Sequence, residues 1–267
     1  MDYKTIQLSK KGMVATITLN RPKRLNALNT FVCSELLDAV KQCEWDSEIR
    51  SVVLTGIGKV FCSGGDVQEM RDFFSEYPQE DPGKIVEELV SAVNLVLLAV
   101  RKLKKPVIGA VKGPCSGGGA GLALACDIIV ASEDTKIHIP NALIGLVPDG
   151  GNSFFLTRKL GRYKAAELFF TAEPLDAEEA LRWGLFNLVV PEEDLLREAD
   201  KFALRLARGP ALAMALAKRM FDVASVNNLE TQLELEKEAV IRCGGTKEFK
   251  EGITAFFEKR SPDFVNI

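Results

Sequence analysis

Apolar and polar positions follow two different periods along the first two thirds of the chain. Residues 13–19 alternate in character and are rich in β-branched side chains, which predicts a strand. Residues 29–46 place apolar side chains at helical spacing behind a candidate N-cap, Asn29 or Thr30. Further strands are predicted at 51–57, 106–111 and 127–132, and further helices at 85–103 and 120–126. Strands that alternate with helices favour right-handed βαβ crossovers and a mostly parallel sheet, so the fold class is α/β.

From about residue 154 onward the pattern becomes mainly helical. Helical periodicity is present over 163–171, 176–184, 192–208, 210–225, 229–243 and 246–260. The last of these segments places Phe249, Ile253, Phe256 and Phe257 along one side. So much aromatic surface on a terminal helix must be covered, either by the chain's own core or by a neighbouring subunit. The polar segment 73–84, which contains two prolines, is the best candidate for a mobile loop.

Composition and charge narrow the class of partner. The chain has 267 residues, 47% of them hydrophobic, and a formal net charge of −3, which argues against a nucleic-acid partner. The basic run 100–106 is the best candidate for a local basic patch, but such a run is more often the solvated end of a helix. No segment reaches the roughly 18 apolar residues of a membrane span, and the N-terminus lacks the apolar core of a signal peptide. We therefore expect no membrane partner.

The six cysteines do not predict a metal centre. They form no C-x-x-C pair and no ligand spacing with His138, which is the only histidine. Scattered cysteines without a signal peptide are typical of reduced thiols, so we expect a cytoplasmic protein without a metal site. His138 lies in a short strand-like run and is expected to be structural.

Two glycine clusters, at 62–66 and 115–121, each follow a predicted strand and open onto a helix. Backbone N–H groups are free there, and glycine lets a ligand approach them closely. No Lys-Ser/Thr pair follows the second cluster, which excludes a P-loop, and the G-x-G-x-x-G pattern of dinucleotide-binding sites is absent. Two readings remain: the glycines allow tight turns, or they supply two backbone donors that converge on one oxygen.

A third turn carries a single acid, Asp149, between a proline and two glycines. Its structural reading is an N-cap of the helix that begins near Gly150. Its chemical reading is an acid or base that acts beside the two glycine clusters.

At these residues the sequence resembles the enoyl-CoA hydratase/isomerase (crotonase) superfamily over essentially its whole length. The stretches that carry the resemblance are 17–29, 52–70, 104–132, 143–161, 178–190 and 251–260. The resemblance implies a core made of a spiral of ββα turns over residues 1–200. It also implies a C-terminal helical region, residues 201–267, that forms trimers or hexamers (dimers of trimers).

The resemblance further implies an acyl-CoA thioester as substrate, with no metal and no cofactor other than the coenzyme A of the substrate. The backbone N–H groups of Gly65 and Gly118 would form an oxyanion hole for the thioester carbonyl. Residues that would contact the coenzyme A part are Lys23, Arg24, Ala27, Gly64, Asp66, Phe256 and Lys259.

Hydratases that resemble this chain use two glutamates, which here are replaced by Gly121 and Asn141. Neither residue relays a proton to water, so hydration is disfavoured. Several isomerases of the superfamily carry a lone acid at the position that matches Asp149. The resemblance therefore implies that Asp149 moves a proton from C2 of a 3-enoyl-CoA to C4, which yields a 2-enoyl-CoA.

Two other functions stay open. A hydratase, a hydrolase or a dehalogenase would use Asp149 as base or nucleophile, and a non-catalytic acyl-CoA binder would not use it at all. Glu76 and Glu80 are candidate auxiliary acids, because the segment 66–84 is placed to fold over an acyl chain, whereas Glu69 is expected to be a solvated helix residue.

Overall fold

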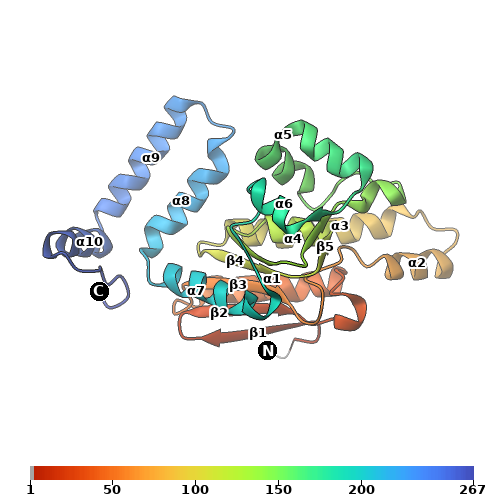
Figure 1. Ribbon diagram of the computed structural model, residues 1–267, viewed down its shortest axis with the longest axis horizontal. Coiled ribbons are helices and arrows are strands. Elements are labelled where there is room, and N and C mark those ends of the chain that lie inside the picture. Colours follow the sequence, from red (N-terminus) through yellow and green to blue (C-terminus); the bar gives the residue numbers. More distant parts are fainter. Residues whose placement is uncertain (1–2) are drawn as a thin grey trace.

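The largest layer of the molecule is a six-stranded sheet, which the computed structural model describes together with the rest of residues 3–267 (Figure 1). Its strand order is β1-β2-β3-β4-β6-β9, with β1 antiparallel to β2 and every later pair parallel. The bounds are β1 Ile6–Lys11, β2 Val14–Leu19, β3 Ser51–Gly56, β4 Val107–Val111, β6 Ile128–Ser132 and β9 Leu188–Val190. A second sheet has the order β5-β7-β8, with bounds Pro114–Ser116, Lys136–His138 and Leu175–Asp176.

Helices connect these strands and then continue alone to the C-terminus. The bounds are α1 Thr30–Trp45, α2 Val67–Glu76, α3 Gly83–Lys102, α4 Gly118–Leu124, α5 Asn152–Thr171, α6 Ala177–Arg182, α7 Leu195–Ala207, α8 Ala211–Ala224, α9 Leu229–Gly244 and α10 Lys247–Glu258. Short 3-10 turns lie at Pro22–Arg24, Pro140–Ile144 and Glu192–Asp194. The Asn29 side chain accepts a hydrogen bond from the Val32 N–H at 2.9 Å, so it caps α1 as predicted.

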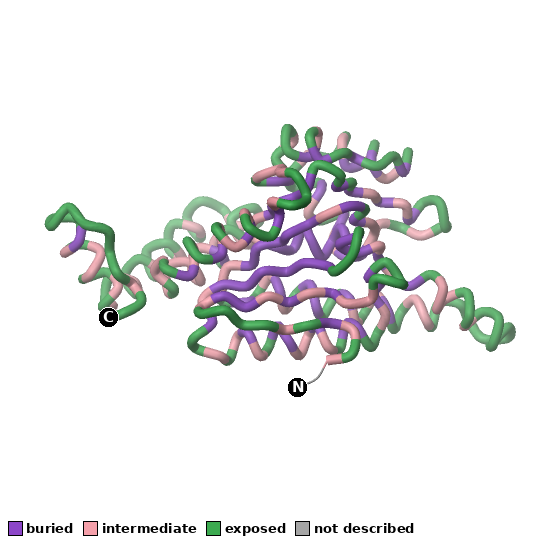
Figure 2. Tube along the Cα trace, turned by 60° about the horizontal axis from the view of Figure 1, so that its bottom comes forward, coloured by how far each residue is buried: buried purple, intermediate pink, exposed green. Residues whose placement is uncertain are grey.

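Helices cover both faces of the main sheet, which explains why every residue of β3 is buried. Val52 and Leu54 belong to the apolar cluster that includes α1 and α3, whereas Val53 packs in a separate cluster with α7. This follows from the period of two in a strand, which sends successive side chains to opposite faces. The buried strands cross the centre of Figure 2, with exposed helices around them. The predicted α/β arrangement with a mostly parallel sheet is confirmed.

The C-terminal helices α8, α9 and α10 extend away from the sheet, and we call residues 208–267 the C-terminal arm (Figure 1). The arm begins just after α7, a helix that still packs against β3 and β4. The predicted boundary between core and helical region, at residue 200, lies inside α7. Large apolar side chains of the arm are exposed in the single chain: Phe221, Val240, Ile241, Phe249, Phe256 and Phe257.

Short strands and the start of α5 were missed by the sequence pattern. β1 was not predicted, because in its six residues only Ile6 is buried and the others face outward or lie at the edge. Helix α5 begins at Asn152, well before the predicted 163, and is interrupted at Gly161, whose φ of 77° breaks the helical period. No helix within residues 3–267 has the length and apolar character needed to cross a bilayer.

Candidate active site

The two glycine clusters lie side by side at the ends of neighbouring strands. Cys62 and Cys115 form a parallel bridge, and the Ser116 N–H donates to the Cys62 carbonyl at 3.0 Å. The first loop is also held from its other side, because the Leu28 N–H donates to the Gly64 carbonyl at 2.7 Å. Parallel strands bring their carboxyl ends to one edge of the sheet, and this edge is where ligands bind in open α/β folds.

Two backbone N–H groups at this edge have no acceptor. The backbone of Leu28 is hydrogen-bonded to Gly64 and Asp66, the residues on either side of Gly65. In this pairing the Gly65 N–H points away from Leu28. Gly118 is the first residue of α4, where no carbonyl of the helix reaches its N–H. Within residues 3–267, neither N–H donates a hydrogen bond. The loops are close, since a Cβ built on Gly64 would lie 3.5 Å from the Gly118 nitrogen. Free donors on adjacent loops have the form of an oxyanion hole.

Asp149 lies on a turn that packs directly against the first turn of α4. A Cβ built on Gly150 would lie 3.0 Å from the Gly118 Cα atom. A Cβ built on Gly121 would lie 1.8 Å from the Gly150 carbonyl oxygen, so no side chain fits at Gly121. The backbone of the Asp149 turn therefore occupies the space that a side chain at position 121 would need.

The carboxylate of Asp149 is half-buried and is held by one side chain. Asn141 donates from its Nδ2 to the Asp149 Oδ1 at 2.9 Å, and no other hydrogen bond to this carboxylate is present in residues 3–267. The helix-cap reading of Asp149 is wrong, because the N-cap of α5 is Gly151 and no side chain caps that helix. One carboxylate oxygen thus remains available for chemistry.

A cavity of about 500 Å³ opens beside Gly65. Its lining residues are Lys23, Arg24, Leu25, Ala27, Ser63, Gly65, Asp66, Val67, Gln68, Ser116, Pro140, Leu143 and Ile144. Lys23 and Arg24 supply positive charge on one wall, and charge of this sign suits phosphate oxygens. Pro140, Leu143 and Ile144, from the 3-10 turn Pro140–Ile144, contribute apolar lining. The structure thus brings together Lys23, Arg24, Ala27, Gly65 and Asp66, five of the residues singled out from the sequence.

Asp66 contributes to this cavity mainly by holding neighbouring side chains in place, because little of its own surface is exposed. Its side chain is 3% exposed and pairs with Arg21 at 3.1 Å and with Arg24 at 3.2 Å. It also caps α2, because its Oδ1 accepts from the Glu69 N–H at 3.2 Å. The carboxylate therefore holds two arginines and a helix in place, so its direct contact with a ligand stays a prediction.

Phe256 and Lys259 do not join this cavity in the single chain. They lie on α10 and at its C-terminal end, in the part of the arm farthest from α2 (Figure 1). The Phe256 ring is 76% exposed. Gly64 lies in the loop beside Gly65 and does not itself line the cavity.

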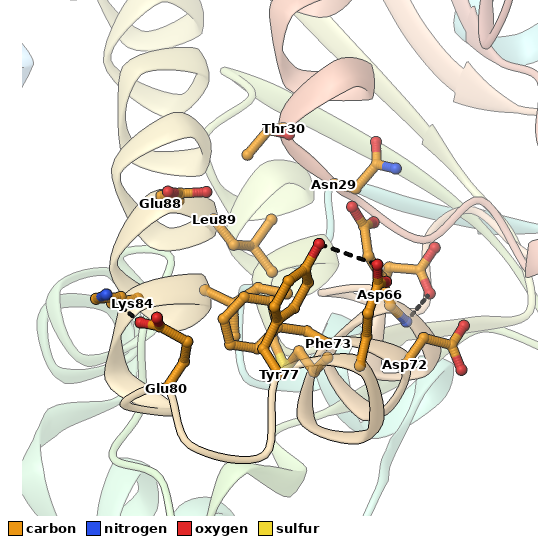
Figure 3. A pocket seen from close by; sticks show the side chains of 14 residues that line it. Asn29, Thr30, Asp66, Asp72, Phe73, Tyr77, Glu80, Lys84, Glu88 and Leu89 are labelled. Atoms are coloured by element: carbon orange, nitrogen blue, oxygen red, sulfur yellow. Dashed lines mark hydrogen bonds and ion pairs between the residues drawn. The ribbon is translucent and has the colours of Figure 1, made fainter.

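A second cavity of about 510 Å³ lies between α2, α3 and the start of α1 (Figure 3). Met70, Phe73, Tyr77, Ile85 and Leu89 form its apolar surface. Carboxylates surround this surface: Asp66, Glu69, Asp72, Glu76, Glu80 and Glu88. It adjoins Gly65, because a Cβ built on Gly65 would lie 3.0 Å from Leu89 Cδ2 and 3.5 Å from Met70 Cε.

The two acids singled out in this region are already partly engaged. Glu76 accepts a hydrogen bond from the Tyr77 hydroxyl at 2.9 Å, and Glu80 pairs with Lys84. Both line the second cavity, so each stays a candidate auxiliary group.

Other reactive groups near the site are neutral or structural. Burial raises the pKa of Cys62 to about 12 and raises that of Cys115 well above its usual value, so both thiols are protonated at neutral pH. The Nε2 atom of His138 is hydrogen-bonded to the Ala172 carbonyl at 2.9 Å, in agreement with its predicted structural role. In the described part of the chain, no three His, Cys, Asp or Glu side chains are grouped to hold a metal ion.

Comparisons with known proteins place this site in context. The sequence profile described as enoyl-CoA hydratase/isomerase matches residues 9–266. The chain is 39% identical to the 1,2-epoxyphenylacetyl-CoA isomerase of Escherichia coli, and the match covers 96% of both chains. It is 36% identical to the short-chain-enoyl-CoA hydratase of Clostridium acetobutylicum, over 97% of both. The crystal structure of an enoyl-CoA hydratase from a Polaromonas species superposes with a TM-score of 0.91 at 35% identity, over 97% of this chain and 98% of that one.

Proposed function

Because the chain belongs to the enoyl-CoA hydratase/isomerase family, we propose that it is an isomerase that moves a double bond in an acyl-CoA. In the proposed reaction a 3-enoyl-CoA becomes a 2-enoyl-CoA. The observation that carries the proposal is the close packing of the Asp149 turn against Gly118 and Gly121. In the proposal, this packing holds Asp149 next to the oxyanion hole, and the Gly150 backbone fills the space where a hydratase glutamate would be.

The oxyanion hole supplies the main stabilisation in this proposal. Removal of a proton from C2 converts the thioester carbonyl into an enolate oxygen that carries negative charge. The free N–H groups of Gly65 and Gly118 donate to this oxygen, and one such donor is worth about 3 kcal/mol in comparable sites. The stabilisation is specific to the transition state, because the charge is absent from the substrate.

Asp149 moves the proton in two steps. Its ionised carboxylate accepts the C2 proton, and the electron pair of that C–H bond delocalises over the thioester oxygen and the C3–C4 double bond. The protonated Asp149 then returns the proton to C4, and the double bond ends between C2 and C3. The same proton leaves and returns, so the balance needs no cofactor, water or metal. A single positioned acid and base of this kind contributes about 10²–10⁴-fold.

Hydration is disfavoured by the chemistry of two positions. The resemblance places the hydratase glutamates at Gly121 and Asn141, and neither residue exchanges a proton with water. The Gly150 carbonyl excludes any side chain at position 121 in this conformation. The mixed names among the relatives do not choose between the two reactions, so the preference rests on these residues.

The two cavities suit the two ends of an acyl-CoA. The phosphates of the coenzyme would lie in the first cavity against Lys23 and Arg24. The acyl chain would enter the second cavity, where Phe73 and Leu89 offer apolar contact and six carboxylates disfavour a negatively charged chain. We therefore propose an uncharged, apolar or aromatic acyl group. Phe256 and Lys259 would reach the adenine end only from a second copy of the chain, within a trimer or hexamer.

Isomerisation of a ring-bearing acyl-CoA is a second candidate. The relative at 39% identity is named for an epoxide of phenylacetyl-CoA. Two aromatic residues, Phe73 and Tyr77, line the second cavity here, with ring centroids 5.3 Å apart. A flat ring would stack against such side chains. This candidate keeps the oxyanion hole and the role of Asp149 and changes only the acyl group.

The test compares wild type with Asp149→Asn in the conversion of 3-hexenoyl-CoA to 2-hexenoyl-CoA, followed by the absorbance of the conjugated product. Asparagine keeps the shape of the side chain but accepts no proton, so we expect kcat to fall by about 10²–10⁴-fold. A parallel assay measures hydration of 2-hexenoyl-CoA, and wild type should show almost none.

The control is Glu178→Gln, an exposed carboxylate on α6 that lines neither cavity, and this variant should keep full isomerase activity. Equal isomerase activity in wild type and Asp149→Asn would contradict the proposed role of Asp149. Rapid hydration by wild type would contradict the choice of isomerase over hydratase.

A further inference from the structure

Asn152 lies between the turn that carries Asp149 and the loop that carries Gly117 and Gly118. Neither the sequence pattern nor the proposed mechanism assigns it a role. It is the first residue of α5 and its side chain is fully buried. Its Nδ2 donates to the Asp149 carbonyl oxygen at 2.8 Å and to the Gly117 carbonyl oxygen at 2.8 Å. One amide group therefore connects the turn that carries the proton-transferring acid to the loop that carries an oxyanion donor.

The bond to Gly117 matters because of what shares its peptide unit. The Gly117 carbonyl and the Gly118 N–H belong to the same planar peptide group, so fixing the carbonyl fixes the direction of the N–H. Gly117 has φ of 49° and ψ of −123°, a conformation that glycine adopts and residues with a Cβ rarely do. The Gly117 oxygen accepts from the Gly121 N–H at 3.1 Å and from Asn152, while the Gly118 N–H on the opposite side stays free.

The bond to Asp149 fixes the second component. The Asn152 backbone N–H also donates to the Asp149 carbonyl, at 3.0 Å, so Asn152 holds this residue by two hydrogen bonds. The Asp149 carboxylate is held separately, by Asn141. Asn152 thus sets where the backbone of Asp149 lies, and Asn141 sets how its side chain points.

The choice of asparagine has a cost that a purely structural role would not require. The Asn152 Oδ1 is buried and has no hydrogen-bond partner within the described residues. A buried polar atom without a partner is unfavourable. Alanine at this first helical position would leave no such oxygen, but it would lose both hydrogen bonds to the carbonyl groups. Only an amide NH₂ offers two protons to two carbonyl oxygens from one atom.

We infer that Asn152 is a positioning residue of the proposed isomerase: it orients and polarises the Gly117–Gly118 peptide as an oxyanion donor and ties it to the backbone of Asp149. A hydrogen bond received by a peptide carbonyl strengthens the bond that the N–H of the same peptide donates, because such chains polarise one another. The inference rests on the proposed function, since it gives Gly118 and Asp149 the roles described above.

The experiment measures the polarised thioester directly, without turnover. A saturated acyl-CoA, labelled with an isotope at the thioester carbonyl, is bound to the protein, and its carbonyl stretching frequency is recorded by difference infrared spectroscopy. We expect wild type and Asp149→Asn to lower this frequency equally, since both keep the backbone contacts. Asn152→Ala should retain less than half of the shift. Its kcat for 3-hexenoyl-CoA should fall by about 10–100-fold, with KM changed by no more than about threefold.

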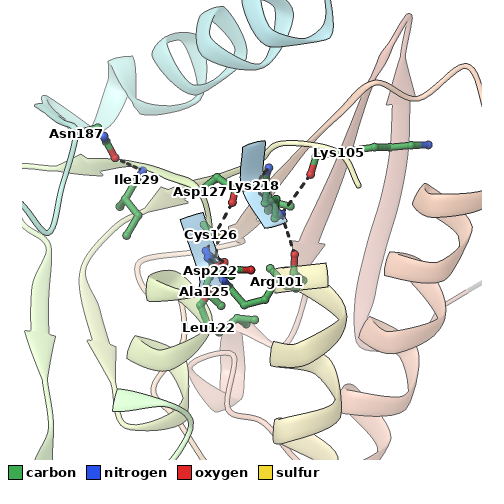
Figure 4. Close-up of polar contacts among 12 residues, drawn as sticks. Arg101, Lys105, Leu122, Ala125, Cys126, Asp127, Ile129, Asn187, Lys218 and Asp222 are labelled. Atoms are coloured by element: carbon green, nitrogen blue, oxygen red, sulfur yellow. Dashed lines mark hydrogen bonds and ion pairs between the residues drawn. The ribbon is translucent and has the colours of Figure 1, made fainter. Parts of the chain in front are cut away.

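The matched control is Asn187→Ala, which loses a different hydrogen bond from an asparagine side chain to the backbone, the 2.8 Å bond between Asn187 Oδ1 and the Ile129 N–H (Figure 4). This variant should lose stability and keep the full carbonyl shift. If Asn152→Ala does not fold, Asn152→Thr replaces it, because its hydroxyl offers one proton where the amide offers two.

The outcomes separate the two proposals. A full shift in Asn152→Ala, with a shift in wild type, would overturn the role of Asn152 alone. No shift in bound wild type would overturn the oxyanion hole and the proposed function with it. A reduced shift in Asn152→Ala beside a normal shift in Asn187→Ala supports the inference.

Discussion

At the scale of single residues, the backbone packing around a position limits which side chain the candidate site can hold there. Gly121 is the clearest case, because the sequence shows only that a glutamate is missing there. The structure shows that a Cβ at this position would lie 1.8 Å from the Gly150 carbonyl oxygen. The absence of a glutamate at position 121 and the position of the turn that carries Asp149 therefore depend on each other. The turn that carries Asp149 packs where the other side chain would have been.

We predict that Gly121→Ala lowers isomerase activity by about 100-fold, the cost of moving a reacting group by about 1 Å. Alanine normally stabilises a helix relative to glycine by about 1 kcal/mol. Here the clash with Gly150 must push the turn away, and overpacking of this kind costs about 1–3 kcal/mol. Steady-state kinetics and thermal unfolding measure the two effects.

Gly244→Ala is the matched control, since a Cβ built on this helical glycine meets no atom within 4 Å. It should keep full activity and the same or slightly higher stability. Full activity in Gly121→Ala would show that the turn does not need this contact.

At the scale of elements, one buried lysine fixes the start of the C-terminal arm. Lys218 of α8 is 9% exposed and pairs with Asp127 at 2.7 Å, beside Arg101 (Figure 4). Its Nζ also donates to the Val100 carbonyl at 3.1 Å, at the end of α3. Arg101 in turn pairs with Asp222 of α8. These contacts join α8 to the C-terminal end of α3 and to Asp127, the residue that directly precedes β6. They therefore set the direction in which the arm leaves the core.

We predict that Lys218→Ala lowers the free energy of unfolding by about 3 kcal/mol, because removing one partner leaves the others with uncompensated charge in a buried site. Limited proteolysis should then cut between α7 and α8 before it cuts the core. The control is Lys237→Ala on α9, where an exposed pair with Glu234 is worth about 0–1 kcal/mol. Equal effects of the two substitutions would contradict an anchoring role for Lys218.

The same lysine gives the stability of the arm a pH dependence. Burial lowers the pKa of Lys218 below its usual 10.5. Between the lowered value and 10.5, the unfolded chain binds more protons at this group than the folded chain does. Stability therefore rises with pH in that window. Urea unfolding just below and just above this window should show wild type gaining stability relative to Lys218→Met, which has no such group.

At the scale of the whole molecule, the arm leaves more apolar surface in solvent than a single chain ordinarily carries. Val240 and Ile241 are 68% and 67% exposed, and Phe256 and Phe257 are both 76% exposed. Figure 2 shows the arm as an exposed extension beside a largely buried core. A surface of this kind is expected to pack against further copies of the chain, which fits the proposed trimer or hexamer.

We predict that wild type sediments as a trimer or a hexamer and that Ile241→Asp sediments mainly as a monomer, because a buried carboxylate without a partner is unfavourable at an interface. Glu236→Gln, an exposed polar change on the same helix, should leave the assembly intact. A wild-type monomer at micromolar concentration would contradict the proposed assembly. Activity of Ile241→Asp should fall through a higher KM, since the proposed contacts from Phe256 and Lys259 would be lost.

The sequence by itself determined the elements that depend on local periodicity. The helices α1 and α3 and the strands β2, β3, β4 and β6 follow from spacing, since a residue's period decides which face it presents. The order of motifs along the chain was also enough to identify the superfamily, and the solved relative at a TM-score of 0.91 confirms that fold. β1 and the start of α5 were not predictable in this way, because an edge strand and a kinked helix lack a clean period.

Only the tertiary structure decided how the site is assembled. Gly65, Gly118 and Asp149 are separated by tens of residues, and their approach depends on strand ends that meet at one edge of the sheet. Asn152 carried no sequence signal, because its role lies in two carbonyl oxygens contributed by other loops. Periodicity reports one face of one element, whereas a site consists of contacts between elements. The sequence therefore determined which residues were candidates, and the packing of backbone on backbone decided which of them lie close together.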